Sequence, residues 1–151
     1  MKVFKINKKD YTPWIEELHY ARRLPSVSYA YGMFLNSKLS GVCTFGMPPS
    51  STLAASIAGK QYQKNVIELN RLITHENLPK NSLSKFVSKS IKLLPKPTII
   101  VSFADPNQQH HGYIYQATNF IYTGISANTN QLIDKNGKEF HFRNIGHYQK
   151  N

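Results

Sequence analysis

The chain has 151 residues, of which 40% are apolar and 12% aromatic, and its 19 Lys and Arg against 8 Asp and Glu give a formal net charge of +11. This length and apolar content predict one globular domain, residues 1–151, and exclude a disordered chain. No apolar run approaches the roughly 18 residues of a membrane-spanning helix, and the N-terminus lacks the apolar stretch of a signal peptide, so we expect a cytoplasmic protein without membrane contact.

The first third of the chain predicts a strand, a helix and a hairpin. Residues 3–6 alternate enough for a short strand. A helix is expected next, because apolar side chains recur at helical spacing from Trp14 until Pro25 ends the pattern. Residues 28–36 and 39–45 are apolar runs joined by a short polar turn, which is the pattern of a β-hairpin.

The middle of the chain predicts a parallel strand pair. The segment from Gly46 to Lys64 is small and polar, and we interpret it as a mobile loop over a site or as a plain linker. Residues 66–74 read as a strand, residues 82–94 as an amphipathic helix and residues 98–103 as a β-branched strand covered on both faces. This order predicts a right-handed βαβ unit.

The last third predicts smaller elements. Residues 113–120 are expected to form a short helix, residues 121–124 a strand, and residues 139–143 another strand after a turn at 135–138. Together the elements predict an α/β domain with a central mixed sheet flanked by helices.

Polar and ionisable side chains lie at the ends of the two predicted parallel strands, where α/β sheets form their ligand sites. They are Glu68, Asn70 and Arg71 in the first strand, Ser102 and Asp105 at the end of the second, and His110, Tyr113 and Tyr115 just beyond it.

The positive charge is spread along the chain, and it favours a polyanionic partner because every neutralised phosphate releases condensed counterions. Nucleic acid is therefore the first partner to consider. A basic protein that binds a phosphorylated cofactor is the alternative.

The predicted order of elements resembles the GNAT acyltransferase fold. Residues 115–120, Tyr-Gln-Ala-Thr-Asn-Phe, resemble the Tyr-x-x-x-Gly-Phe run of that superfamily, in which the tyrosine protonates the departing CoA thiolate. The resemblance gives this role to Tyr115. It also implies a CoA thioester, whose phosphates would meet Lys80, Asn81 and the N–H groups near Ser82, with Asn119 at the usual glycine position.

A closer resemblance covers residues 66–124. The blocks Glu-Leu-Asn-Arg-Leu, Leu-Pro-Lys-Asn, Ser-Phe-Ala-Asp-Pro and Ile-Tyr-Gln-Ala-Thr-Asn, with His110 and Gly112, resemble the phage Mom family of DNA modification proteins, a divergent GNAT branch. The resemblance implies an enzyme that converts adenine N6 in double-stranded DNA to a carbamoylmethyl derivative. Such a modification would protect phage DNA from restriction in the host cytoplasm.

Adenine N6 is a poor nucleophile, so a base must take its proton while another group stabilises the leaving group. Asp105 is the first candidate for the base and Glu68 the second, and Tyr115 would be the acid. An Asp-Pro turn that caps the next helix is the alternative interpretation of Asp105. Ser102 and Tyr113 would shape the pocket.

Asn70 and Arg71 are neighbours in a strand, so we expect their side chains on opposite faces. Arg71 could clamp a phosphate, and Asn70 could bind an adenine edge through paired hydrogen bonds. A purely structural contact between Glu68 and Arg71 is the alternative.

Metal chemistry is a weaker hypothesis. The single cysteine, Cys43, excludes an internal disulfide and a multi-cysteine zinc site, and its apolar neighbours suggest a buried structural thiol. His110 and His111 with Asp105 could contribute to a ferrous iron site. Iron is considered because carbamoylmethyl attaches through a methylene, which attack on a thioester carbonyl would not give.

Two other functions remain open. One is an ordinary GNAT-type transfer of an acyl group to a small-molecule or protein amine, and the other is a DNA-binding protein without catalysis. The sequence does not decide the oligomeric state, and a monomer and a homodimer are both alternatives.

Overall fold

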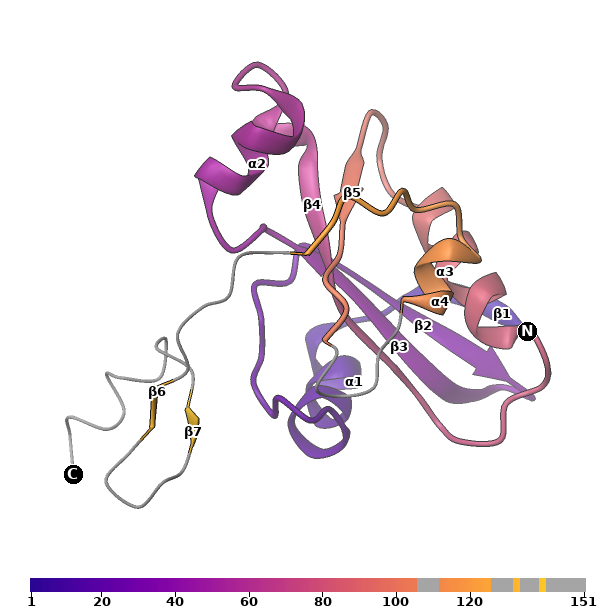
Figure 1. Cartoon of the computed structure of the whole chain (residues 1–151). Coiled ribbons are helices and arrows are strands. Elements are labelled where there is room, and N and C mark those ends of the chain that lie inside the picture. The colour runs from indigo at the N-terminus through magenta and orange to yellow at the C-terminus, as the bar shows by residue number, and fades with distance from the viewer. Residues whose placement is uncertain (106–111, 126–131, 134–138, 141–151) are drawn as a thin grey trace. The chain divides into compact units, whose positions relative to one another are not determined.

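The computed structural model describes residues 1–105, 112–125, 132–133 and 139–140 (Figure 1). The chain divides into two compact units, Met1–Ile121 and Tyr122–Asn151. In the second unit, the short strands β6 (Leu132–Ile133) and β7 (Glu139–Phe140) pair antiparallel. The predicted turn at 135–138 and the end of the last predicted strand lie outside the described residues. One domain over residues 1–151 stays a prediction.

The first unit is built on a five-stranded mixed sheet with the order β1-β2-β3-β4-β5. Strands β1 to β4 pair antiparallel with their neighbours, whereas β4 and β5 are parallel, as the sequence predicted. The strands are β1 (Lys2–Lys5), β2 (Tyr29–Leu35), β3 (Lys38–Gly46), β4 (Val66–Thr74) and β5 (Ile99–Val101).

Helices connect these strands. They are α1 (Lys8–Pro13), which continues as the π-helical turn η1 (Trp14–Leu18), α2 (Ser51–Ala58), the 3-10 turn η2 (Gln63–Asn65), α3 (Ser82–Lys92) and α4 (Tyr113–Gln116). Within the described part of the chain, no helix has the length and apolar character needed to cross a membrane.

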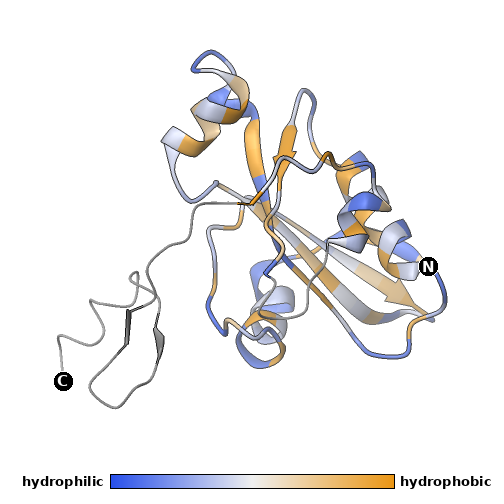
Figure 2. Cartoon of the chain, in the orientation of Figure 1, coloured by the Kyte–Doolittle hydropathy of each residue, from blue (hydrophilic) through white to orange (hydrophobic). Residues whose placement is uncertain are grey.

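Two apolar clusters lie on the sheet and come from alternate residues of the same strands, because successive side chains of a strand point to opposite faces. Cys43 and Phe45 pack with Phe86 and Val87 of α3, whereas Val42 packs with the residues of α1 and η1. Figure 2 shows the apolar residues concentrated on the strands. Cys43 is fully buried, which confirms the predicted structural thiol, and burial raises its pKa.

The β-hairpin and strand β4 form where the sequence placed them. Asn36 and Ser37 have φ values of 47° and 64°, and a two-residue turn with both φ values positive matches the twist of the strands it joins. Strand β4 has the predicted bounds, and α3 ends two residues before the predicted end at 94.

The first and second helices differ from the sequence expectation. Helix α1 begins earlier, because the Asn7 N–H donates to Asp10 Oδ2 at 2.9 Å, and η1 ends at Leu18, well before Pro25. The segment predicted as a loop or linker contains α2, whose N-terminus is capped by Ser50 Oγ accepting from the Leu53 N–H at 3.1 Å. Its many small residues gave no clear apolar period.

The predicted strand 98–103 is shorter and less covered than expected. Strand β5 lies at an edge among the described strands, and Ile99 is 38% exposed. The β4–β5 ladder stops at the Glu68–Val101 pair, after which Ser102 Oγ donates to the Leu69 carbonyl at 3.0 Å. The chain therefore leaves the sheet next to the centre of β4.

The predicted strand at 121–124 does not form, since residues 121–125 adopt neither helix nor strand. Ile121 and Tyr122 are 88% and 77% exposed, so the apolar pattern that suggested a strand has no covering layer among the described residues.

Candidate active site

Strand β4 contains a bulge at Asn70. The register pairs Thr44 with Arg71 and the next residue, Phe45, with Leu69, so Asn70 is an extra residue without a partner on β3. A bulge of this kind breaks the strict alternation of side chains and redirects those beside it.

The bulge brings the side chains of Asn70 and Arg71 to the same neighbouring segment. Asn70 Nδ2 donates to the Ser26 carbonyl at 2.8 Å, and Arg71 Nη2 donates to the Arg23 carbonyl at 3.0 Å. Asn70 Oδ1 also accepts from Thr44 Oγ1 at 2.7 Å. The expectation that Asn70 and Arg71 point to opposite faces is wrong, because alternation holds only where a strand has no bulge.

Arg71 is half-buried, and its guanidinium makes two hydrogen bonds to backbone carbonyls. Nη1 donates to the Asn70 carbonyl at 2.6 Å, while Nε is buried and has no hydrogen-bond partner among the described residues. Burial lowers the pKa of Arg71, and the neighbouring Tyr20 and Glu68 partly oppose that shift. Glu68 lies near enough to Arg71 to influence its pKa, and a structural contact between the two stays a hypothesis.

Asp105 interacts with Tyr20, a residue that the sequence did not single out. The pKa of Tyr20 is raised by burial first and then by the charge of Asp105 and a hydrogen bond to it, while the cation of Arg71 opposes the rise. Tyr20 follows η1, and nothing in its local sequence indicates a partner so far along the chain. The cluster of Asp105, Tyr20 and Arg71 therefore depends on tertiary structure.

Tyr115 and Ser102 form the second part of the site. Burial raises the pKa of Tyr115, and its hydrogen bond with Ser102 opposes part of that rise. The same Ser102 hydroxyl donates to the backbone of β4, which fixes it at the point where the parallel strands separate. The Tyr115 phenol therefore holds its proton more tightly than an ordinary tyrosine.

The backbone after α4 holds the Tyr115 ring in place. The Phe120 N–H donates to the Tyr115 carbonyl at 3.0 Å, Asn119 has a φ of 65°, and the rings of Tyr115 and Phe120 lie 5.4 Å apart. This arrangement is a Schellman-type helix end, which requires a left-handed residue at the position of Asn119. Gly adopts this conformation most readily, and Asn adopts it more readily than most other residues.

The predicted phosphate-binding residues lie together at the start of α3. Lys80 and Asn81 are exposed, and Ser82 is 7% exposed. Asn81 has a φ of 63°, and its carbonyl accepts from the Lys85 N–H at 3.1 Å. The side chain of Asn81 makes no capping bond to the helix.

The profile of the Mom protein family matches residues 1–151. The chain belongs to the Mom protein family. The methylcarbamoylase mom of Escherichia phage Mu is 30% identical to it over an alignment of 132 residues, which covers 84% of this chain and 54% of that protein. The chain thus spans about half the length of this curated Mom relative.

Two solved structures share the fold of this Mom family member. Both are of an aminoglycoside acetyltransferase from an uncultured soil metagenomic sample, one in complex with sisomicin and one with trehalose. The TM-scores are 0.60 and 0.59 at 11% and 12% identity, and each match covers 88% of this chain and 96% of that chain. The predicted mixed α/β, GNAT-like fold is confirmed.

The remaining predicted residues of this Mom chain are less enclosed or fall outside the described ranges. Tyr113 is 73% exposed, and His110 and His111 lie outside the described residues. Among the residues that the structure describes, no group of three or more His, Cys, Asp or Glu could hold a metal ion. His75 instead packs on Trp14 with ring centroids 4.6 Å apart. An iron site that includes His110 or His111 therefore stays a hypothesis.

Proposed function

We propose that this Mom family member modifies adenine N6 in double-stranded DNA with a carbamoylmethyl-type group and so protects phage DNA in the host cytoplasm. The observation that carries the proposal is the family match over the whole chain, combined with a carboxylate and a neutral phenol at one end of β4 and β5. The net charge of +11 fits a DNA substrate. The name of the phage Mu relative supports the added group.

The site supports a division of proton transfer. The added group replaces a hydrogen of adenine N6, so a base must accept one proton, and we assign this role to Asp105. Tyr20 would orient the Asp105 carboxylate. Tyr115 would donate its proton to the leaving group, with Ser102 holding its hydroxyl.

An activated donor is needed as well. A carbamoylmethyl group attaches through a methylene, so its donor must carry the leaving group on that carbon, because attack on a thioester carbonyl would give an amide. A CoA thioester would serve the alternative acyl transfer to an amine, and Lys80, Asn81 and the N–H groups near Ser82 would bind its phosphates. The exposed position of Lys80 and the start of α3 fit this use. Asn119 would act there mainly through its backbone conformation.

The proposed site has four further members, which are Glu68, Asn70, Tyr113 and His110. Glu68 lies close enough to Arg71 and Tyr115 to influence the pKa of both. Both functional atoms of the Asn70 amide already bond within the protein, so we assign Asn70 to holding the site together. Exposed Tyr113 would be available to stack on an extruded base.

A second candidate function is acyl transfer to an amine of a small molecule or protein. It is favoured by the fold shared with an acetyltransferase. It predicts thioester-dependent acylation in the absence of DNA, whereas a DNA-binding protein without catalysis predicts binding and no product.

The test is mass spectrometry of nucleosides from plasmid DNA of cells that express the protein. Wild type is compared with Asp105→Asn and with the charge-matched control Glu76→Gln, which alters an exposed carboxylate. We expect a new adenosine species with wild type and Glu76→Gln but not with Asp105→Asn. Identical digests from wild type and empty vector would overturn the proposal, and the purified protein would then be assayed for amine acylation with acetyl-CoA.

A further inference from the structure

The lysines of this chain are unevenly distributed relative to its acidic residues. Residues 77–104 contain five Lys and no Asp or Glu, and residues 1–9 contain four Lys and no acidic residue. Strand β1 and helix α3 come from these two segments and pack against each other. The tertiary structure therefore joins two stretches that carry only positive charge.

Helix α3 presents its lysines along one face. Lys85, Lys89 and Lys92 are spaced four and three residues apart, which places them in one stripe of an α-helix. All three are exposed, whereas Phe86 and Val87 on the opposite face are fully buried against the sheet. Lys85 to Lys92 spans roughly 10 Å at 1.5 Å per residue.

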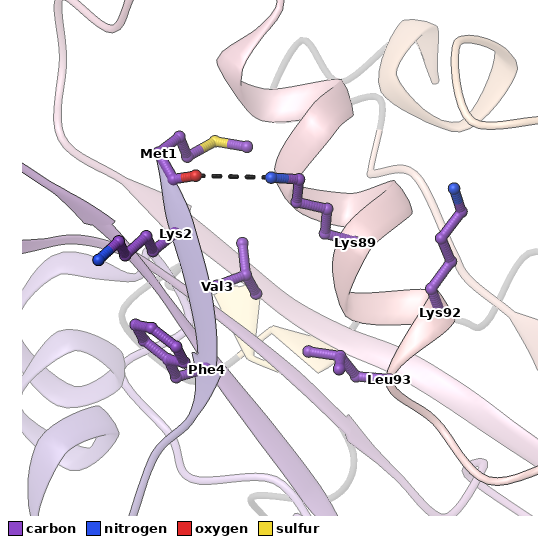
Figure 3. A pocket seen from close by; sticks show the side chains of 7 residues that line it. All are labelled: Met1, Lys2, Val3, Phe4, Lys89, Lys92 and Leu93. Atoms are coloured by element: carbon purple, nitrogen blue, oxygen red, sulfur yellow. Dashed lines mark hydrogen bonds between the residues drawn. The ribbon is translucent and has the colours of Figure 1, made fainter.

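An open groove lies between this stripe and strand β1. The groove has a volume of about 540 Å³, and Figure 3 shows Val3 and Leu93 between β1 and α3, whereas Lys2 and Phe4 extend from β1 on the side away from α3. Lys89 Nζ donates to the Met1 carbonyl at 3.5 Å, which links the two elements. Leu93 is 51% exposed, so apolar surface lies beside the α3 lysines.

We propose that the lysine surface, defined as Lys85, Lys89 and Lys92, binds the phosphate backbone of duplex DNA. This inference rests on the proposed function and names the surface that would hold its substrate. The helix length between Lys85 and Lys92 corresponds to about three base-pair rises of 3.4 Å, so these lysines can reach successive phosphates. The exposed Leu93 beside them can pack on a sugar.

The position of this surface suits a duplex that also reaches the candidate active site. Strand β1 is three positions from β4 in the sheet, which is roughly 14 Å at the usual strand spacing. One turn of B-DNA is about 34 Å, so one duplex can contact both regions. Phosphate contacts carry no base information, so the lysine surface would contribute affinity rather than target choice.

The experiment measures duplex binding by fluorescence anisotropy over a range of salt concentrations. Lys85→Gln with Lys92→Gln is compared with the control Lys8→Gln and Lys9→Gln, which removes the same charge from α1 on the other face of the sheet. Gln has a helix propensity close to that of Lys, so both double variants should fold. We expect the slope of log K against log salt to fall in magnitude by about 1–2 in the α3 variant only. A separate double variant, Lys85→Arg with Lys92→Arg, keeps both positive charges and should show the wild-type slope.

Equal slopes for the α3 variant, the α1 control and wild type would overturn the lysine surface, as would an equal fall in both double variants. Nucleoside mass spectrometry on wild type separates this result from the proposed function. A modified adenosine together with unchanged slopes leaves the function and removes the surface. A lowered slope without any modified adenosine leaves the surface and removes the function.

Discussion

Asn70 and Arg71 are consecutive residues of one strand, and their side chains both bond to the backbone of residues 23–26. The bulge at Asn70 makes this arrangement possible. It ties the segment after η1 to β4, and the same segment brings Tyr20 to Asp105. The position of Tyr20 beside Asp105 therefore depends on the hydrogen bonds that Asn70 and Arg71 of β4 make to residues 23–26.

Replacing Asn70 by Ala should lower the free energy of unfolding by about 1–3 kcal/mol, because a buried donor loses its acceptor. The donor is the Thr44 hydroxyl, which belongs to a fully buried residue. Urea unfolding followed by circular dichroism measures the change. Adding Thr44→Val to Asn70→Ala should recover part of the loss, and a further loss of similar size in the double variant would contradict this explanation.

Tyr20→Phe should reduce the rate of DNA modification by about 10-fold, which corresponds to ~1.4 kcal/mol. The substitution keeps the ring and removes only the hydroxyl that bonds to Asp105. Single-turnover kinetics on duplex DNA should show a lower rate constant with little change in DNA affinity. Tyr62→Phe is the matched control, because Tyr62 is exposed to a similar degree, 54% against 51% for Tyr20, and lies between α2 and η2. A loss of affinity with an unchanged rate would assign Tyr20 to DNA binding instead.

The Tyr115 hydroxyl should give stability a specific dependence on pH. Its pKa in the folded protein lies above the ordinary value of 10, so the folded state holds this proton more tightly than the unfolded state. Its contribution is complete below pH 10 and is lost as pH rises through the folded pKa. The difference in unfolding free energy between wild type and Tyr115→Phe should therefore shrink as pH rises above 10 in urea titrations. A difference that stays constant or grows would contradict the raised pKa.

Asn119 offers a test that separates backbone conformation from cofactor binding. Asn119→Ala should lower the free energy of unfolding by about 1 kcal/mol, because a left-handed conformation is strained for most L-residues. Asn119→Gly should preserve stability, since Gly adopts positive φ without strain. Thermal unfolding compares the two variants. If Asn119→Gly retains full activity, the Asn119 side chain has no role in cofactor binding.

The sequence alone determined the order of strands β1 to β5 along the chain and the bounds of β4. Strand and hairpin patterns are local, because they follow from apolar alternation and from turn residues such as Asn36 and Ser37. The blocks around Glu68, Ser102 and Tyr115 likewise indicated the family, and the net charge favoured a polyanionic partner. Short apolar stretches such as 121–124 were misleading, because a strand also needs a neighbour.

Tertiary structure decided how the site is assembled. The Asn70 bulge depends on how β3 and β4 pair, and no local pattern records which residue of a strand will be left without a partner. The contact of Tyr20 with Asp105 joins residues far apart in sequence, and the burial of Phe86 and Val87 against the sheet leaves the α3 lysines facing outward. Residue types set the available chemistry, whereas the packing of separate segments determines which side chains meet.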